Sequence, residues 1–195
     1  MRVLKTLIAL SVIVILSMGA YIYAGAFRIG ADVPHTRLVY WLMQLTRDRA
    51  VAIQSSDIHV PSDLNDPKRL LEGAGQYAAM CSGCHLAPGF EDNETHRGLY
   101  PKPPRLAIDT GLSAAQIFWV LKHGLKMTGM PAWGATHSDE ELWNITAFVQ
   151  QLPTLDAQKY KDIVSRAPMD PDMTKMPMPQ GKAMVDSDSK SPDEG

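Results

Sequence analysis

The chain has 195 residues, 45% of them hydrophobic, and a formal net charge of −2, which gives no sign of a basic nucleic-acid-binding surface. Its two cysteines exclude a scaffold of several disulfides and any site built from four thiolates of this chain. The 14 glycines and 14 prolines predict long irregular loops.

The N-terminal segment predicts a membrane helix. Residues 1–5 form a basic end, and an uncharged apolar run covers residues 6–27. As a helix this run spans about 33 Å, which matches the ~30 Å hydrocarbon core of a bilayer. A signal peptide is the alternative, because Ala24-Gly25-Ala26 resembles a cleavage site, but its apolar region is normally shorter. The length favours a transmembrane anchor of the inner membrane, with the chain from Arg28 onward on the periplasmic or other extracytoplasmic side.

The juxtamembrane segment, residues 28–61, predicts an amphipathic helix over about 36–53. Its apolar stripe has two interpretations. The favoured one is that the helix packs on the domain that follows, and the alternative is that Trp41 and its neighbours lie on the membrane surface. The stripe consists of Leu38, Trp41, Leu42, Leu45, Ala52 and Ile53.

Residues 62–152 predict an all-α domain of three or more helices with long loops. Asp66 before Pro67 predicts a helix over about 67–80. Capping boxes at Ser113 and Ser138 predict helices that end near 123 and 152. Residues 86–109 have no sustained periodicity and are expected to be a loop. A domain of this size with so much irregular backbone buries little apolar surface, so a large apolar cofactor would stabilise it.

Both cysteines lie in the motif Cys81-Ser82-Gly83-Cys84-His85, at the end of the helix over 67–80. A redox dithiol needs a βαβ sheet that the sequence does not predict, and zinc needs further ligands at fixed spacing. The pattern C-x-x-C-H is the attachment signature of c-type haem, in which two thiols tether the macrocycle and the adjacent histidine binds the iron. An export segment agrees with this third interpretation, so one covalent haem c is the predicted cofactor.

A second iron ligand is expected from the loop that contains Met127 and Met130. A thioether favours reduced iron and raises the reduction potential. Met130 is preferred because Gly129 allows close approach of the backbone and Pro131 restricts it. The ordinary alternative is that either methionine only fills the core.

The chain resembles the membrane-anchored monohaem class I cytochromes c, whose domain is shared with cbb3-oxidase c-subunits. The features that carry this resemblance are the C-x-x-C-H motif and the stretch Gly129–Gly134 (GMPAWG). The likeness covers residues 66–152, and the stretch 31–35 (ADVPH) also resembles the anchored group. It implies that Met130 is the distal ligand and that the Pro104 carbonyl accepts a hydrogen bond from His85. Leu106 completes that P-x-L stretch, and Trp133 is expected beside the haem.

The resemblance also implies close packing between the first and last helices of the domain. Gly73 and Tyr77 match the first helix, and Ile145 and Phe148 match the last. His96, in the long first loop, receives no role.

The function expected from these features is one-electron transfer, not catalysis, between membrane or periplasmic redox partners such as dehydrogenases, oxidases or other cytochromes. Two alternatives remain. One is a haem gas sensor or enzyme with an open sixth site. The other is a copper-handling protein, because the extension over 153–195 ends in a tail, predicted to be disordered from about 166, whose five methionines suit Cu(I).

Overall fold

The computed structural model describes residues 1–108 and 110–168. Within them the chain is all-helical, as predicted, and no strand is present. The methionine-rich tail and its expected disorder lie outside the described residues. The α-helices are α1 (Arg2–Tyr23), α2 (Arg37–Gln54), α3 (Pro67–Met80), α4 (Ser82–His85), α5 (Glu94–Gly98), α6 (Ala114–His123), α7 (Asp139–Gln151) and α8 (Ala157–Arg166), with 3-10 turns η1 (Trp133–Ala135) and η2 (Leu152–Thr154).

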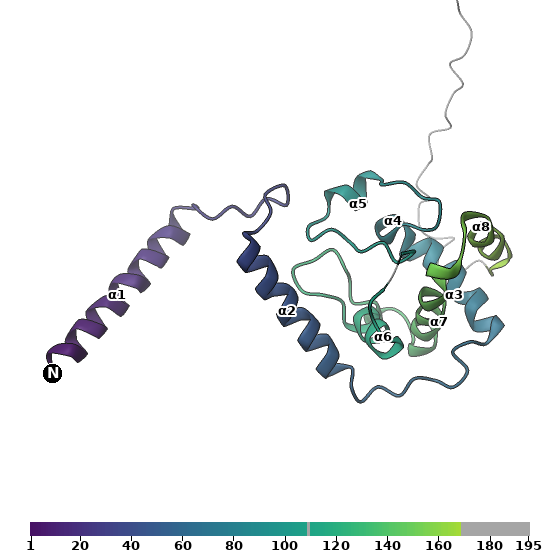
Figure 1. The fold of residues 1–195 in the computed structure, drawn as a ribbon, viewed down its shortest axis with the longest axis horizontal. Coiled ribbons are helices and arrows are strands. Elements are labelled where there is room, and N and C mark those ends of the chain that lie inside the picture. Colours follow the sequence, from purple (N-terminus) through teal and green to yellow (C-terminus); the bar gives the residue numbers. More distant parts are fainter. Residues whose placement is uncertain (109, 169–195) are drawn as a thin grey trace, which may run out of the picture.

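Helix α1 stands apart from the rest of the chain (Figure 1). It is apolar, with a mean hydropathy of 2.2 over its most apolar window, and none of that window is buried. By length and composition it can cross a membrane, although an N-terminal signal sequence has the same properties. The helix therefore fits the predicted anchor without deciding whether the segment is cleaved.

The three principal helices of the domain begin where the sequence predicted. The side chain of Asp66 accepts the backbone N–H of Lys68 at 2.8 Å, with Pro67 in the first turn of α3. Ser113 and Ser138 form complete capping boxes at the starts of α6 and α7. Each cap satisfies backbone donors that a helix start otherwise leaves unpaired.

The core is organised by the contact between α3 and α7, the first and last of these helices. Gly73 lies so close to α7 that a Cβ atom there would overlap the backbone carbonyl of Asn144. One turn later, the rings of Tyr77 and Phe148 lie 5.5 Å apart between centroids. Tyr77, Ile145 and Phe148 are fully buried. The close packing implied by the resemblance is therefore present.

A buried polar cluster joins the same two helices. Arg69, which is 8% exposed, donates to the Asn144 side chain at 2.7 Å and pairs with Asp63 and Glu140 at 2.9 and 3.0 Å. The Asn144 amide donates in turn to Glu72 at 2.8 Å. Because Arg69 belongs to α3 and its guanidinium binds Asn144 and Glu140 of α7, it ties the two helices together, and it also neutralises the carboxylates of Asp63 and Glu140.

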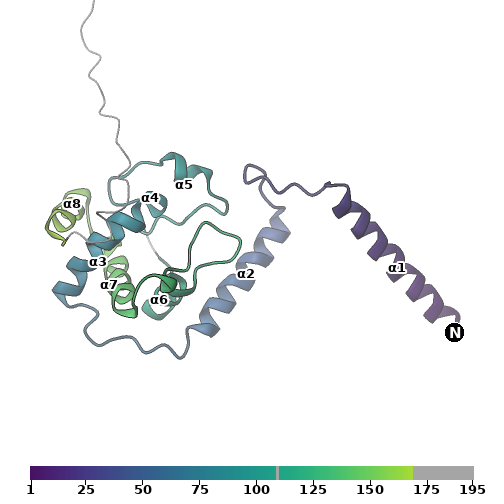
Figure 2. The ribbon, with the colours of Figure 1, turned by 180° about the vertical axis from the view of Figure 1, so that it is seen from behind.

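Helix α8 was not predicted and extends the domain beyond residue 152. Asp156 caps it, and its Tyr160 is 3% exposed against the rings of Phe148 and Phe90. The helix is short, but its apolar residues Tyr160, Ile163 and Val164 follow helical spacing behind the Asp156 cap, so the sequence carries a local signal for it. The view from behind shows α8 beside α3 and α7, on the side of the domain away from α2 (Figure 2).

Helix α2 forms at the predicted place and packs on the domain that follows, but most of its apolar stripe takes no part in that contact. The only buried residue of α2 is Val51, and the helix contacts the domain through α6. The large apolar residues of the predicted stripe are exposed instead, with Leu38 at 72%, Trp41 at 57% and Leu42 at 54%. The apolar side thus faces away from the domain.

Candidate functional site

A single helical turn brings together the side chains of the C-x-x-C-H motif. Cys81 ends α3 and begins α4, and its carbonyl accepts the N–H groups of Cys84 at 3.1 Å and His85 at 2.8 Å. Cys81 is buried and Cys84 half-buried, and both thiols are free. Two thiols and an imidazole therefore stand on one rigid turn, at the edge of the core.

The chemistry of this turn does not support the two rival interpretations of the motif. Burial raises the pKa of the Cys81 thiol to about 12, with a smaller contribution from Cys84. A redox-active cysteine requires the opposite shift, towards the thiolate. Among the described residues no three His, Cys, Asp or Glu side chains are grouped to hold a metal ion, so a zinc site built from such residues gains no support.

The His85 imidazole is held by the loop that contains Pro104. Its Nδ1 lies 2.9 Å from the Pro104 carbonyl oxygen. Because a carbonyl only accepts, Nδ1 carries the proton and Nε2 keeps its lone pair. Burial lowers the pKa of His85, and the Pro104 hydrogen bond opposes that shift. The neutral ring, with one nitrogen oriented by a backbone carbonyl, is the form that binds a metal.

The two loop methionines have different environments. Met130 is half-buried and packs against the hydrophobic core, whereas Met127 is 90% exposed. The Met130 backbone is held on both sides, because its N–H donates to the Thr128 hydroxyl at 3.1 Å and its carbonyl accepts the Leu125 N–H at 3.2 Å. The inward methionine is thus the one that the sequence preferred.

The remaining expected contacts lie on the same core. Leu106 and Trp133 are half-buried and pack, like Met130, against a cluster that includes Cys81. The donor set consists of two free thiols, one oriented imidazole and one inward thioether beside apolar side chains. These residues fit a covalently held haem, whose large apolar macrocycle needs such walls and whose iron takes nitrogen and thioether ligands.

His96 is the residue of this region that sequence reasoning missed. It is 1% exposed, and its Nδ1 lies 2.7 Å from the Cys84 carbonyl oxygen. Its Nε2 is 3.7 Å from Asp92, which also pairs with Arg105, the residue after Pro104. This series of contacts, from the Cys84 carbonyl through His96 and Asp92 to Arg105, links the cysteine motif to the loop that holds His85. No sequence signal predicts this link, because a lone histidine in a loop is usually exposed.

Comparison with protein families supports the assignment of this region as a haem-binding cytochrome c domain. Residues 68–149 match the family model described as cytochrome C oxidase, cbb3-type, subunit III. No curated protein and no solved structure matches the chain. The matched region contains the cysteine motif, the Pro104 loop, Met130 and the α3–α7 contact. Over residues 68–149 the chain therefore matches a cbb3-type cytochrome c domain, a type of domain that binds haem c.

Proposed function

We propose that this protein carries single electrons by means of one haem c, attached through Cys81 and Cys84 and ligated by His85 and Met130. The observation that carries the proposal is the oriented imidazole of His85, beside two free thiols on a core that Met130 also contacts. When bound, the haem supplies an iron that alternates between the ferrous and ferric states.

The protein's own residues have three tasks in this function. Cys81 and Cys84 would hold the haem covalently, each through one thioether bond. The Pro104 carbonyl keeps the proton on Nδ1 of His85, so that Nε2 stays available. The Met130 thioether would be the second iron ligand, which would leave no site for a substrate and would stabilise the reduced state.

We further propose that α1 anchors the domain in the inner membrane, on the periplasmic side. Confinement near the membrane raises its effective concentration for membrane-bound donors and acceptors. Partners of this kind are dehydrogenases, oxidases and other cytochromes, with which the protein acts as a free carrier or as a subunit of a complex. Residues 62–152 carry seven Lys and Arg and ten Asp and Glu, so a strongly basic docking surface is not expected.

Spectroscopy of two matched variants tests the ligand set. The oxidised protein should show the long-wavelength charge-transfer band of methionine–iron ligation. Met130→Ala should lose the band, and Met127→Ala should keep it because its side chain is exposed. Loss of the band in Met127→Ala alone would refute the assignment. Haem should remain on the chain in a denaturing gel, and Cys81→Ser with Cys84→Ser should remove it.

Carbon monoxide separates a carrier from a haem sensor or enzyme. The reduced protein should bind carbon monoxide slowly or not at all, because Met130 occupies the axial site. Met130→Ala should bind it at once. Immediate binding by the unaltered protein would show an open sixth site and would overturn the proposal of electron transfer.

A further inference from the structure

Helix α2 presents an apolar surface to the solvent. We call this surface the outer face, and it consists of Leu38, Trp41, Leu42, Leu45 and Ile53, all exposed. Leu38, Leu42 and Leu45 follow the i, i+4, i+7 spacing that gathers side chains on one side of a helix. At about 100° per residue, Leu42 lies opposite Val51, which is nine positions later and is the buried residue of α2. Helix α2 therefore packs on the domain at Val51, near its C-terminal end, and the outer face on the opposite side lacks a partner within the described residues.

The position of α2 in the chain indicates what covers this face. Only residues 24–36 separate it from α1, and a segment of that length reaches at most about 50 Å. If α1 crosses a membrane, α2 begins within that reach of the membrane's surface. In Figure 1, α2 lies between α1 and the domain. The burial of Val51 on the opposite side turns the outer face away from the domain core.

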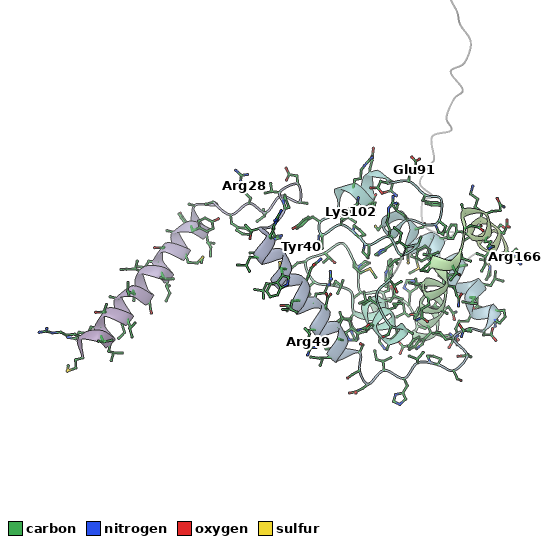
Figure 3. The ribbon with its side chains drawn as sticks, viewed as in Figure 1. Arg28, Tyr40, Arg49, Glu91, Lys102 and Arg166 are labelled. Carbon is green, nitrogen blue, oxygen red and sulfur yellow. The ribbon has the colours of Figure 1, made fainter. Side chains whose placement is uncertain are left out.

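Charge favours a lipid surface. Residues 24–54 contain four arginines, at positions 28, 37, 47 and 49, against two aspartates, whereas residues 62–152 are net acidic. Figure 3 labels Arg28 in the connection and Arg49 near the end of α2. Arg49 lies on the same side as the outer face, and its long stem allows the guanidinium to reach headgroups beside buried leucines. Apolar residues with Trp and Arg around them are typical of helices that lie in the interface of anionic bilayers.

We propose that α2 is an interfacial helix whose outer face lies in the headgroup region of the membrane that α1 crosses. This proposal rests on the proposed anchoring by α1 and is independent of the haem ligands. Helix α1 is long and apolar enough to cross a membrane, whereas α2 is too polar to do so.

Docking of α2 would also orient the haem domain. His35, just before α2, donates its N–H to the Tyr100 hydroxyl at 2.9 Å, and the two rings stack with centroids 5.4 Å apart. Leu99, next to Tyr100, lies against Gly129, next to Met130. The juxtamembrane segment is thus connected to the Met130 loop. With α2 on the lipid, this loop lies near the membrane, where a membrane-embedded electron partner can approach it.

Spin labelling of the full-length holoprotein tests the proposal. A nitroxide is attached at Leu42→Cys, on the outer face, and in a control protein at Gln158→Cys, an exposed position on α8 at the other side of the domain. Both are reconstituted in vesicles of phosphatidylethanolamine and phosphatidylglycerol. The label at 42 should be reached better by oxygen, which is lipid-soluble, than by a water-soluble nickel chelate. The label at 158 should show the reverse.

The outcomes of this experiment distinguish failure of the interfacial helix from failure of the α1 anchor or of the proposed electron transfer. A label at 42 that is open to the nickel chelate, in protein that still floats with the vesicles, would overturn the interfacial helix and leave the anchor intact. Dipolar broadening between labels, or shielding from both reagents, would show that a second copy or another protein covers the face and would also overturn it. Protein that does not float refutes the anchor itself, and the haem spectrum reports separately on electron transfer. In phosphatidylcholine alone, the label should be less immersed; equal immersion would refute the role of the arginines.

Discussion

The contact of Gly73 with α7 leads to a quantitative prediction for Gly73→Ala. A methyl group at this position would overlap the backbone carbonyl of Asn144 and touch the Cβ of Phe148. Backbone atoms cannot rotate away as the end of a side chain can, so α3 and α7 must separate. These two helices make the principal contact of the core, and α3 ends at the cysteine motif.

Two opposing contributions, helix propensity and overpacking, determine how much Gly73→Ala changes the free energy of unfolding. Alanine is a better helix former than glycine by about 1 kcal/mol. Overpacking a tight core costs about 1–3 kcal/mol, and the upper end applies because the obstacle is backbone. The expected net loss is therefore about 2 kcal/mol of the free energy of unfolding. For a domain of this size, that loss lowers the melting temperature by about 8–16 °C.

Thermal unfolding of the full-length holoprotein in detergent, followed by circular dichroism, measures this loss. The matched control is Gly98→Ala in α5, where an added Cβ would have no heavy atom within 4 Å. That control should melt within a few degrees of the unaltered protein. A Gly73→Ala protein that melts with the control would refute the inference that backbone overlap limits residue 73 to glycine.

Two further predictions concern the polar groups of the domain. Lys102 and Arg105 hold the pKa of Asp92 at about 2, so this carboxylate adds stability above its unfolded-state pKa of ~3.9 that is lost as pH falls towards 2. Acid titration should therefore show weaker pH dependence between about 4 and 2 in Asp92→Asn than in the unaltered protein, and identical curves would contradict the ion pairs. Arg69→Met should lower the free energy of unfolding by about 1–3 kcal/mol, because the buried Asn144 oxygen loses its donor. Guanidinium unfolding measures this change, and a loss below about 0.5 kcal/mol would show that the cluster contributes little net stability.

Local sequence patterns were sufficient for much of the fold. The caps at Asp66, Ser113 and Ser138 depend on side chains within three residues of the backbone groups that they bind, so they are readable from the sequence. The C-x-x-C-H motif is equally local, because one turn determines the separation of its thiols and imidazole. The short helix α5 escaped prediction because it has too few residues for apolar periodicity, whereas the Asp156 cap and the helical spacing of Tyr160, Ile163 and Val164 make α8 readable from the sequence.

Other features depend on contacts between distant parts of the chain. The sequence shows that α2 is amphipathic, but only the packing of Val51 on the domain decides that the opposite, apolar side is exposed. The exposure of Met127 and the inward position of Met130 likewise follow from how their loop meets the core.

By itself, then, the sequence determined the capped helices α3, α6 and α7, the thiol–imidazole turn and the apolar N-terminal segment, because each results from interactions over a few residues. Only the tertiary structure decided that His96 is buried against the Cys84 carbonyl, which it reaches across a loop of 12 positions. It also decided that α2 turns its leucines outward. Both outcomes depend on which surfaces meet when the helices pack, and no local pattern encodes that choice.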